Sequence, residues 1–138
     1  MLIESIRLKQ ACFMPCIERE IRLEADTKRG GFRLFLKERG LIKPEHDPYR
    51  WLGDEDVAPL LKEICQLNPG MSGLDGLTGC DGETFVLTIS SGASRVRFEW
   101  WCEPPEGWEP LAKIAEMLED LCPPEWEMIY PPMQGGPA

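Results

Sequence analysis

The sequence predicts an α+β fold, with an antiparallel sheet of about five strands and two helices packed on one face of the sheet. Three observations indicate this class. Apolar and polar residues alternate over several short segments, as in half-buried strands. Two other segments place apolar residues three and four positions apart, as in helices. Short polar turns separate successive strands, and such turns favour antiparallel pairing.

The N-terminal part is predicted to form a three-stranded meander. Apolar and polar residues alternate from Leu2 to Lys9, over 17–25 and over 32–38. The polar turn at 26–31 is short, so the strands on either side of it are expected to pair. Glu and Arg would also suit a helix over 17–25, but the period of two favours a strand. Residues 40–53 contain two prolines and two glycines and are expected to form a loop.

The first helix is predicted after this loop. Asp56 is the expected N-cap, and a buried stripe runs at helical spacing from Val57 to Leu67. This start would place Pro59 in the first turn, where its missing N–H is tolerated. The helix-breaking residues Asn-Pro-Gly at 68–70 are expected to end the helix.

The segment from Glu83 to Cys122 carries the clearest pattern in the chain. Strands are predicted over 83–90 and 94–102, and the Ser-Gly turn between them predicts a hairpin. Trp100 shares the core-facing register of the second strand. Trp101 is expected on the opposite face, where it is either an interface anchor or covered by another part of the chain.

The second helix is predicted to begin near Trp108, with Pro110 in its first turn. Its apolar stripe runs from Leu111 to Leu121 and defines a buried side, while the acidic side chains between these positions define a solvent side. Trp108 is expected to fold back into the core and fix the angle at which the helix starts. Two prolines at 123–124 end the helix.

This segment carries a resemblance to other proteins. A strand ends in Trp100–Trp101, a corner follows at Pro104–Pro105, and the pattern Trp-x-Pro-Leu over 108–111 opens the helix. Over residues 81–121, about 40 of the 138, the chain resembles a group of small uncharacterised bacterial proteins. The resemblance implies a bacterial origin and the hairpin-to-helix arrangement. It carries no activity over to this chain.

The length of 138 residues predicts a single domain. We expect the domain to span 1–122 and residues 123–138 to form an irregular tail rich in proline and glycine. The N-terminus has neither a basic segment nor a long apolar run, so neither a signal peptide nor a membrane span is expected. The cytoplasm is therefore the expected location.

Charge is distributed unevenly along the chain, whose net charge is −9. Residues 1–50 carry 11 Lys or Arg against 8 Asp or Glu, and residues 51–138 carry 4 against 16. An acidic surface repels phosphate, which argues against nucleic acid as a partner and favours a basic protein. A solvated surface that maintains solubility is the alternative interpretation.

Cysteine and histidine usage argues against a metal or other cofactor. Cys12 and Cys16 have C-x-x-x-C spacing, but the chain contains one histidine, so a four-ligand zinc site lacks its usual second half. The cysteines are expected to be reduced, since no secretion signal is present. Cys65, Cys102 and Cys122 are expected to serve as small apolar side chains.

Residues 68–82 carry glycine at every third position from Gly70 to Gly82. No Gly-Lys-Ser/Thr sequence follows, as a phosphate loop would need, and the alternating oxygen ligands of a calcium loop are missing. The segment is expected to be a connection, and a binding loop containing Asp75 and Asp81 is the alternative.

No catalytic residue is predicted. His46 lies beside two carboxylates, but adjacent residues do not face one another and the flanking prolines indicate an exposed loop. A cysteine nucleophile would depend on the same histidine for its base. The motifs of serine hydrolases, zinc proteases and dinucleotide-binding enzymes do not occur in the sequence.

The hypothesis that best uses the charge distribution is a non-catalytic inhibitor or immunity-type protein that binds a basic partner such as a toxin. The alternatives are a self-associating adaptor, such as a homodimer joined through a sheet face or edge, and a small-molecule enzyme that uses the 68–82 segment. The residues predicted to contact a partner are one tryptophan and six carboxylates: Trp101, Glu109, Glu116, Glu119, Asp120, Asp75 and Asp81.

Overall fold

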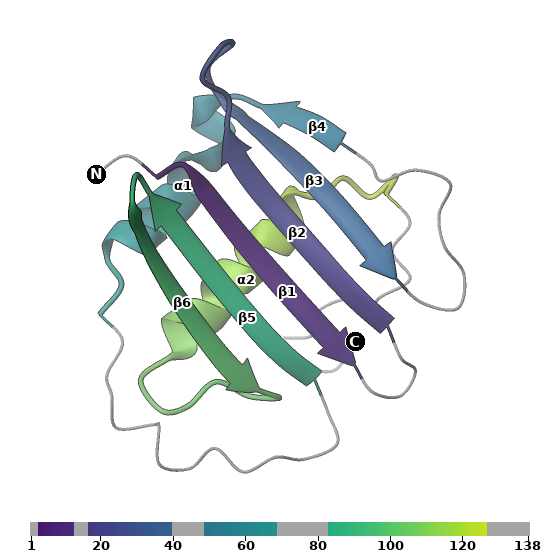
Figure 1. The fold of residues 1–138 in the computed structure, drawn as a ribbon, viewed down its shortest axis with the longest axis vertical. Helices are drawn as coiled ribbons and strands as arrows, with labels where there is room; N and C mark the ends of the chain where they lie inside the picture. Colours follow the sequence, from purple (N-terminus) through teal and green to yellow (C-terminus); the bar gives the residue numbers. More distant parts are fainter. Residues whose placement is uncertain (1–2, 13–16, 40–48, 69–82, 127–138) are drawn as a thin grey trace.

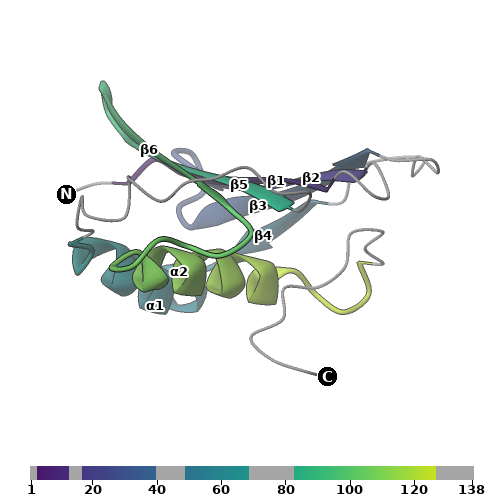
Figure 2. The ribbon, with the colours of Figure 1, turned by 90° about the horizontal axis from the view of Figure 1, so that it is seen from below.

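The computed structural model describes residues 3–12, 17–39, 49–68 and 83–126. It confirms the α+β class: a six-stranded antiparallel sheet carries two helices on one face (Figure 1 and Figure 2). The other face, called here the open face, has no helix over it in this part of the chain. The elements are β1 (Ser5–Cys12), β2 (Ile17–Ala25), β3 (Phe32–Arg39), β4 (Tyr49–Leu52), α1 (Asp54–Cys65), β5 (Glu83–Ser91), β6 (Ser94–Trp101) and α2 (Glu109–Leu121).

The strand order is β4-β3-β2-β1-β5-β6, so the meander and the hairpin form one sheet. The central strand β1 joins them because it pairs with β2 on one side and with β5 on the other. Leu8 in β1 lies opposite Ile21 in β2 and Leu87 in β5, and all three side chains are fully buried. This shared register places one apolar face of the sheet against the helices.

Strand β4 corrects the prediction that residues 40–53 form a loop. Residues 49–52 pair with β3, while 40–48 lie outside the described residues. The indole of Trp51 donates a hydrogen bond to the Gly30 carbonyl at 2.8 Å, and the rings of Tyr49 and Phe35 lie 5.3 Å apart. A four-residue strand is too short to show a period, so these contacts across the sheet define it.

The start of α1 also differs from the prediction. Gly53 is the N-cap, and Asp56 lies in the first turn, where its carboxylate accepts a hydrogen bond from the Gly53 N–H at 3.1 Å. Asp56 therefore contributes to the cap from the third helical position. Because the helix begins earlier than predicted, Pro59 lies beyond the first turn. In α2, Trp108 is the N-cap and Pro110 lies in the first turn, as predicted.

The core lies between the sheet and the helices. Trp100 and Trp108 are buried, as predicted, and each meets another aromatic ring. Trp100 stacks on Phe85 with ring centroids 5.4 Å apart, and Trp108 meets Phe98 edge-on at 5.7 Å. Trp126, in the segment predicted to be an irregular tail, packs against this core, and residues 127–138 lie outside the described part.

The cysteines divide in a way that the sequence did not predict. Cys122 is buried, as expected for a small apolar side chain, but Cys65 and Cys102 are exposed. Cys65 lies one residue beyond the buried Ile64 and so falls on the solvent side of the last turn of α1. Cys102 occupies the corner after β6 with a φ of 57°, in the left-handed region.

Neither of the helices that the structure describes is long and apolar enough to cross a membrane.

Candidate functional site

The residues predicted to contact a partner do not form one surface. Trp101 follows the buried Trp100 in β6 and pairs with Thr84, which places it on the open face. The carboxylates of α2 lie with the helices on the opposite side of the sheet (Figure 2). Asp75 and Asp81 lie outside the described residues. Within the described part, the prediction therefore divides between two faces.

A stripe of carboxylates lies on α2. Glu109 and Asp120 are exposed and Glu116 is half-buried, and their spacing of seven and four residues places them along one side of the helix. Among the described residues, no ion pair involves these three side chains. Lys113 lies between them, and its ammonium pairs with Glu63 of α1 at 3.0 Å.

The first turn of α1 adds three exposed acidic residues. Negative side chains at a helix N-terminus are stabilised by the positive end of the helix dipole, so these carboxylates have a structural reason to be there. Together with the α2 stripe they make the helix side of the molecule acidic. Apart from Glu119, the exposed or half-buried carboxylates of the two helices, called here the acidic helix face, are Asp54, Glu55, Asp56, Glu63, Glu109, Glu116 and Asp120.

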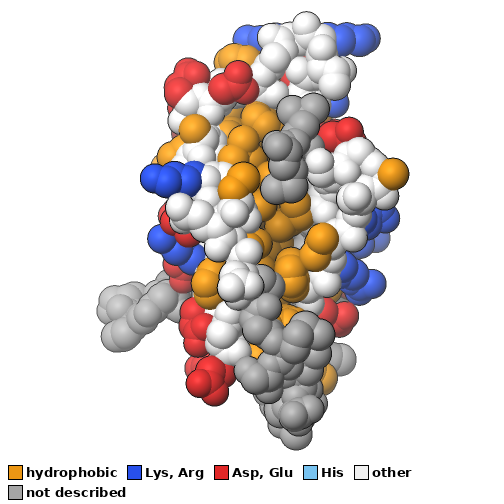
Figure 3. Space-filling view, turned by 90° about the vertical axis from the view of Figure 1, so that its left-hand side faces the viewer, with side chains coloured by type: hydrophobic (Ala, Val, Ile, Leu, Met, Phe, Trp, Pro, Cys, Tyr) orange, Lys and Arg blue, Asp and Glu red, His pale blue; other side chains and the backbone are white. Residues whose placement is uncertain are grey.

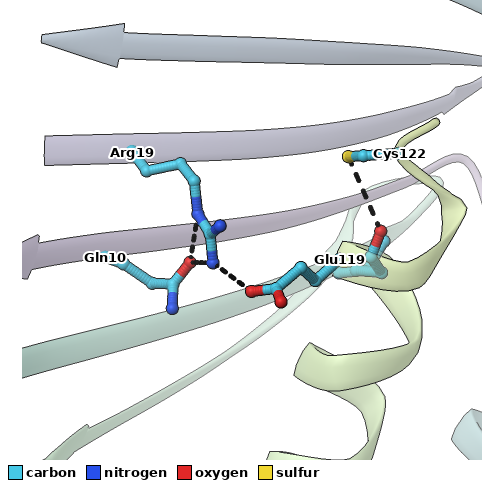
Figure 4. A network of polar contacts seen from close by, with 5 residues as sticks. Gln10, Arg19, Glu119 and Cys122 are labelled. Carbon is cyan, nitrogen blue, oxygen red and sulfur yellow. Dashed lines mark hydrogen bonds and ion pairs between the residues drawn. The ribbon is translucent and has the colours of Figure 1, made fainter. Parts of the chain in front are cut away.

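Glu119 corrects the prediction that it lies on the solvent side of α2. Its Oε2 atom accepts a hydrogen bond at 2.6 Å from Nη2 of Arg19, and its side chain is only 13% exposed. Nε of Arg19 donates a second hydrogen bond, at 2.6 Å, to Oε1 of Gln10 (Figure 4). Glu119 therefore anchors α2 to the sheet.

Sequence reasoning missed Arg19, although its position contained a signal. Arg19 lies between Ile17 and Ile21 in the buried register of β2, where the pattern calls for an apolar side chain. Gln10 and Glu38 occupy the same level of the neighbouring strands, opposite Arg19, and both are buried. Three buried polar residues side by side on adjacent strands predict that their side chains form a hydrogen-bond network with one another.

Cys122 lies beside this network but is a poor nucleophile. Its Sγ lies 3.9 Å from the Leu118 carbonyl oxygen, and the charges of Arg19 and Glu119 act on the thiol (Figure 4). Burial raises the pKa of the Cys122 thiol to about 12. A thiol with this pKa remains protonated at neutral pH, and the thiolate is the reactive form.

The open face is basic, in contrast to the net charge of the chain. Its described strands carry eight Lys or Arg residues and four Glu residues, on alternate positions that face away from the helices. The basic residues are Arg7, Lys9, Arg22, Arg33, Lys37, Arg39, Arg95 and Arg97, and the acidic residues are Glu18, Glu20, Glu24 and Glu99.

Two hollows adjoin one another on the open face and share Lys9 and Val86. The first has a volume of about 340 Å³, and the second about 270 Å³. Together they form a shallow depression over β1 and β5, called here the open-face trough. The charged residues that line it are Arg7, Lys9, Arg19, Lys37, Arg39, Arg95, Arg97, Glu18 and Glu20, of which Arg19 has its side chain buried on the helix side.

Candidates for metal binding and catalysis remain few. Among the described residues, no three His, Cys, Asp or Glu side chains lie together as metal ligands would. His46, Cys16 and the segment 69–82 lie outside the described part.

A scan against protein-family models finds no match, and a search of curated proteins finds no significant match.

Proposed function

We propose that the chain is a non-catalytic binding protein of the inhibitor or immunity type, and that its acidic helix face docks on a basic partner protein. The observation that supports this proposal is the separation of charge between the two sides of the sheet. Such a separation orients a charged partner before contact, and complementary charge raises association rates. The resemblance over residues 81–121 would make the protein bacterial.

The α2 stripe would supply the steering charge. The carboxylates of Glu109, Glu116 and Asp120 take part in no ion pair with the rest of the described chain, so their charge remains available to a partner. Met117 and Leu121 are half-buried next to the stripe and could add apolar contact. Charged groups at an interface rim act mainly on the association rate, whereas apolar anchors act on dissociation.

Charge reversal on α2 tests this proposal. Affinity capture from the host lysate at low and moderate salt would first identify a stoichiometric basic partner. Replacing Glu109, Glu116 and Asp120 by lysine should then lower the association rate about tenfold or more at low salt. Glu119 is left unchanged because it anchors the helix.

The matched control makes the same kind of charge change on the other side of the sheet. Glu18→Lys with Glu20→Lys reverses two carboxylates of the open face that lie away from β6, and should leave the association rate nearly unchanged. Equal slowing in both variants would indicate a net-charge effect without a defined docking face. An unchanged rate in the α2 variant would refute the proposal.

The open-face trough favours a second candidate function, the binding of a short acidic segment of a partner protein. Seven Lys or Arg residues line the trough, six of them with side chains on the open face, against two Glu residues, so its own charge is opposite to that of the chain. Lys9→Glu with Lys37→Glu should abolish binding of an acidic partner segment and spare capture of a basic partner. If binding of the acidic segment survived this change, the second candidate would be wrong.

A further inference from the structure

We infer that two copies of this chain pair through β6, strand against antiparallel strand, with Phe98 of both copies on the two-fold axis. The inference does not depend on the proposed function, since it concerns a sheet edge and not the helix face. β6 ends the strand order, and β5 is its one neighbour among the described strands. It has eight residues, whereas β4 at the other end has four. A long free edge is a ready template for another strand.

Among the described residues, the backbone hydrogen-bonding groups of β6 that β5 does not bind lie at alternate positions. The N–H of Cys102 donates to the Glu83 carbonyl at 2.7 Å, which fixes which pairs of β5 and β6 are hydrogen-bonded. By alternation, the N–H and C=O groups of Val96, Phe98 and Trp100 face β5. Those of the residues between and beside them point away from the sheet: Arg95, Arg97, Glu99 and Trp101.

The sequence of β6 is complementary to itself about Phe98. In an antiparallel pair centred there, Arg97 lies opposite Glu99 of the second copy, and the same contact recurs on the other side of the axis. Val96 lies opposite Trp100, and Arg95 lies opposite the indole of Trp101. Opposite charges, apolar pairs and a cation beside an aromatic ring are all favourable across strands.

The neighbouring registers lack this property. Residues directly opposite one another must lie on the same face of the sheet, so the two-fold axis must pass through a residue and not between two residues. The nearest alternatives to Phe98 are therefore the residues on either side of it. An axis at Arg97 places two arginines face to face, and an axis at Glu99 places two glutamates face to face. Like charges directly opposite are destabilising. The charges of β6 therefore select the register centred on Phe98.

Val96 and the charged side chains that would form this contact are accessible, whereas Trp100 is buried. Val96 is 50% exposed, and the side chains of Arg97 and Glu99 are 63% and 57% exposed. The tip of the β5–β6 hairpin rises away from the helix layer in Figure 2. In Figure 3, which shows the β6 side of the molecule, hydrophobic side chains form a central stripe bordered by charged ones.

The experiment measures self-association of the full chain by sedimentation equilibrium over a range of concentrations. The unmodified chain should form a dimer. Arg97→Glu would set glutamates opposite one another, and Glu99→Arg would set arginines opposite one another, so each variant should dimerise at least about tenfold more weakly. The double variant, Arg97→Glu with Glu99→Arg, should recover dimerisation, because opposite charges then face one another again at both contacts.

Mixing the two single variants gives a sharper test. An equimolar mixture of Arg97→Glu and Glu99→Arg should form a heterodimer, since every facing charge is again opposite. Unchanged far-UV circular dichroism and melting curves would show that both variants are folded. A monomer at all concentrations, a dimer insensitive to both single changes, or failure of the double variant and the mixture to recover would each overturn the inference.

Discussion

The guanidinium of Arg19 in β2 donates a hydrogen bond at 2.6 Å to the carboxylate of Glu119 in α2, although the Arg19 side chain has no exposed surface. The two residues are 100 positions apart in the chain. A buried arginine is tolerated when its charge is matched and its N–H groups are satisfied, and Gln10 supplies a second acceptor. The pair therefore fixes the position of α2 on the sheet.

Removing the carboxylate should destabilise the fold strongly. Glu119→Ala leaves the buried charge of Arg19 without its partner in α2, and breaking such a pair costs roughly 3 kcal/mol of unfolding free energy. The neighbouring Asp120 is exposed, so Asp120→Ala should change the same quantity by less than about 0.5 kcal/mol. Urea unfolding followed by circular dichroism measures both values.

A triple variant separates the burial of the charges from their pairing. Arg19→Met combined with Glu38→Gln and Glu119→Leu removes the three buried charges, and it should be less destabilising than Glu119→Ala because no unpaired charge remains in the core. If Glu119→Ala proved no more destabilising than Asp120→Ala, the contact would make no net contribution to stability.

Gly31 should tolerate substitution less well than the adjacent Gly30. Both have a positive φ, 71° and 81°, but a Cβ atom on Gly31 would clash with the Leu52 carbonyl and lie 2.6 Å from the Trp51 ring. A Cβ atom on Gly30 would meet nothing within 4 Å. Gly30→Ala should therefore cost about 1 kcal/mol from the backbone alone, and Gly31→Ala about 3 kcal/mol. Equal melting temperatures for the two variants would contradict this reading of the β4 contact.

The fold class could be predicted because its signals are local. The alternation in β2 and the spacing from Leu111 to Leu121 depend on a few consecutive residues, and the structure keeps both. Strand β4 could not be predicted in this way, because its four residues are defined by pairing with β3 and by the contact of Trp51 with the β2–β3 turn. The start of α1 was misplaced because Asp56 contributes to the cap from within the helix.

The candidate site was less accessible from sequence because charge depends on tertiary position. Helical spacing placed Glu119 among the solvent-side residues, but a buried arginine in a distant strand binds it. Net charge predicted an acidic surface, yet the alternate positions of the strands make the open face basic. Sequence periodicity assigns each residue to one face of its own helix or strand. It does not show which residues of a distant helix or strand will pack against that face.

Trp100 and Trp101 are adjacent but should respond differently to substitution. Trp100 is 2% exposed and stacks on Phe85, so Trp100→Ala should lower the unfolding free energy by about 3–5 kcal/mol. Trp101 is only partly buried on the open face, and Trp101→Ala should cost less than half as much. Thermal and urea unfolding measure both changes. A larger loss for Trp101→Ala would place it in the structural core rather than on an interaction surface.

The cysteines should differ in their reactivity toward alkylating reagents. Burial raises the pKa of the Cys122 thiol from its ordinary value of 9.0 to about 12, whereas Cys65 and Cys102 are exposed. At pH 8, iodoacetamide should therefore modify Cys65 and Cys102 in the folded protein well before Cys122. Peptide mapping by mass spectrometry over time gives the three rates. Rapid modification of Cys122 without unfolding would show that this end of α2 opens readily.

The same shift predicts how Cys122 contributes to stability at alkaline pH. Because its pKa is higher in the folded state, the unfolded chain loses the thiol proton first as pH rises. The contribution is fully present below about pH 9 and declines between about 9 and 12. The stability of the unmodified chain relative to Cys122→Ala should therefore be constant at neutral pH and shrink above pH 9. Urea unfolding of both chains at several pH values tests this, and a constant difference up to pH 11 would contradict it.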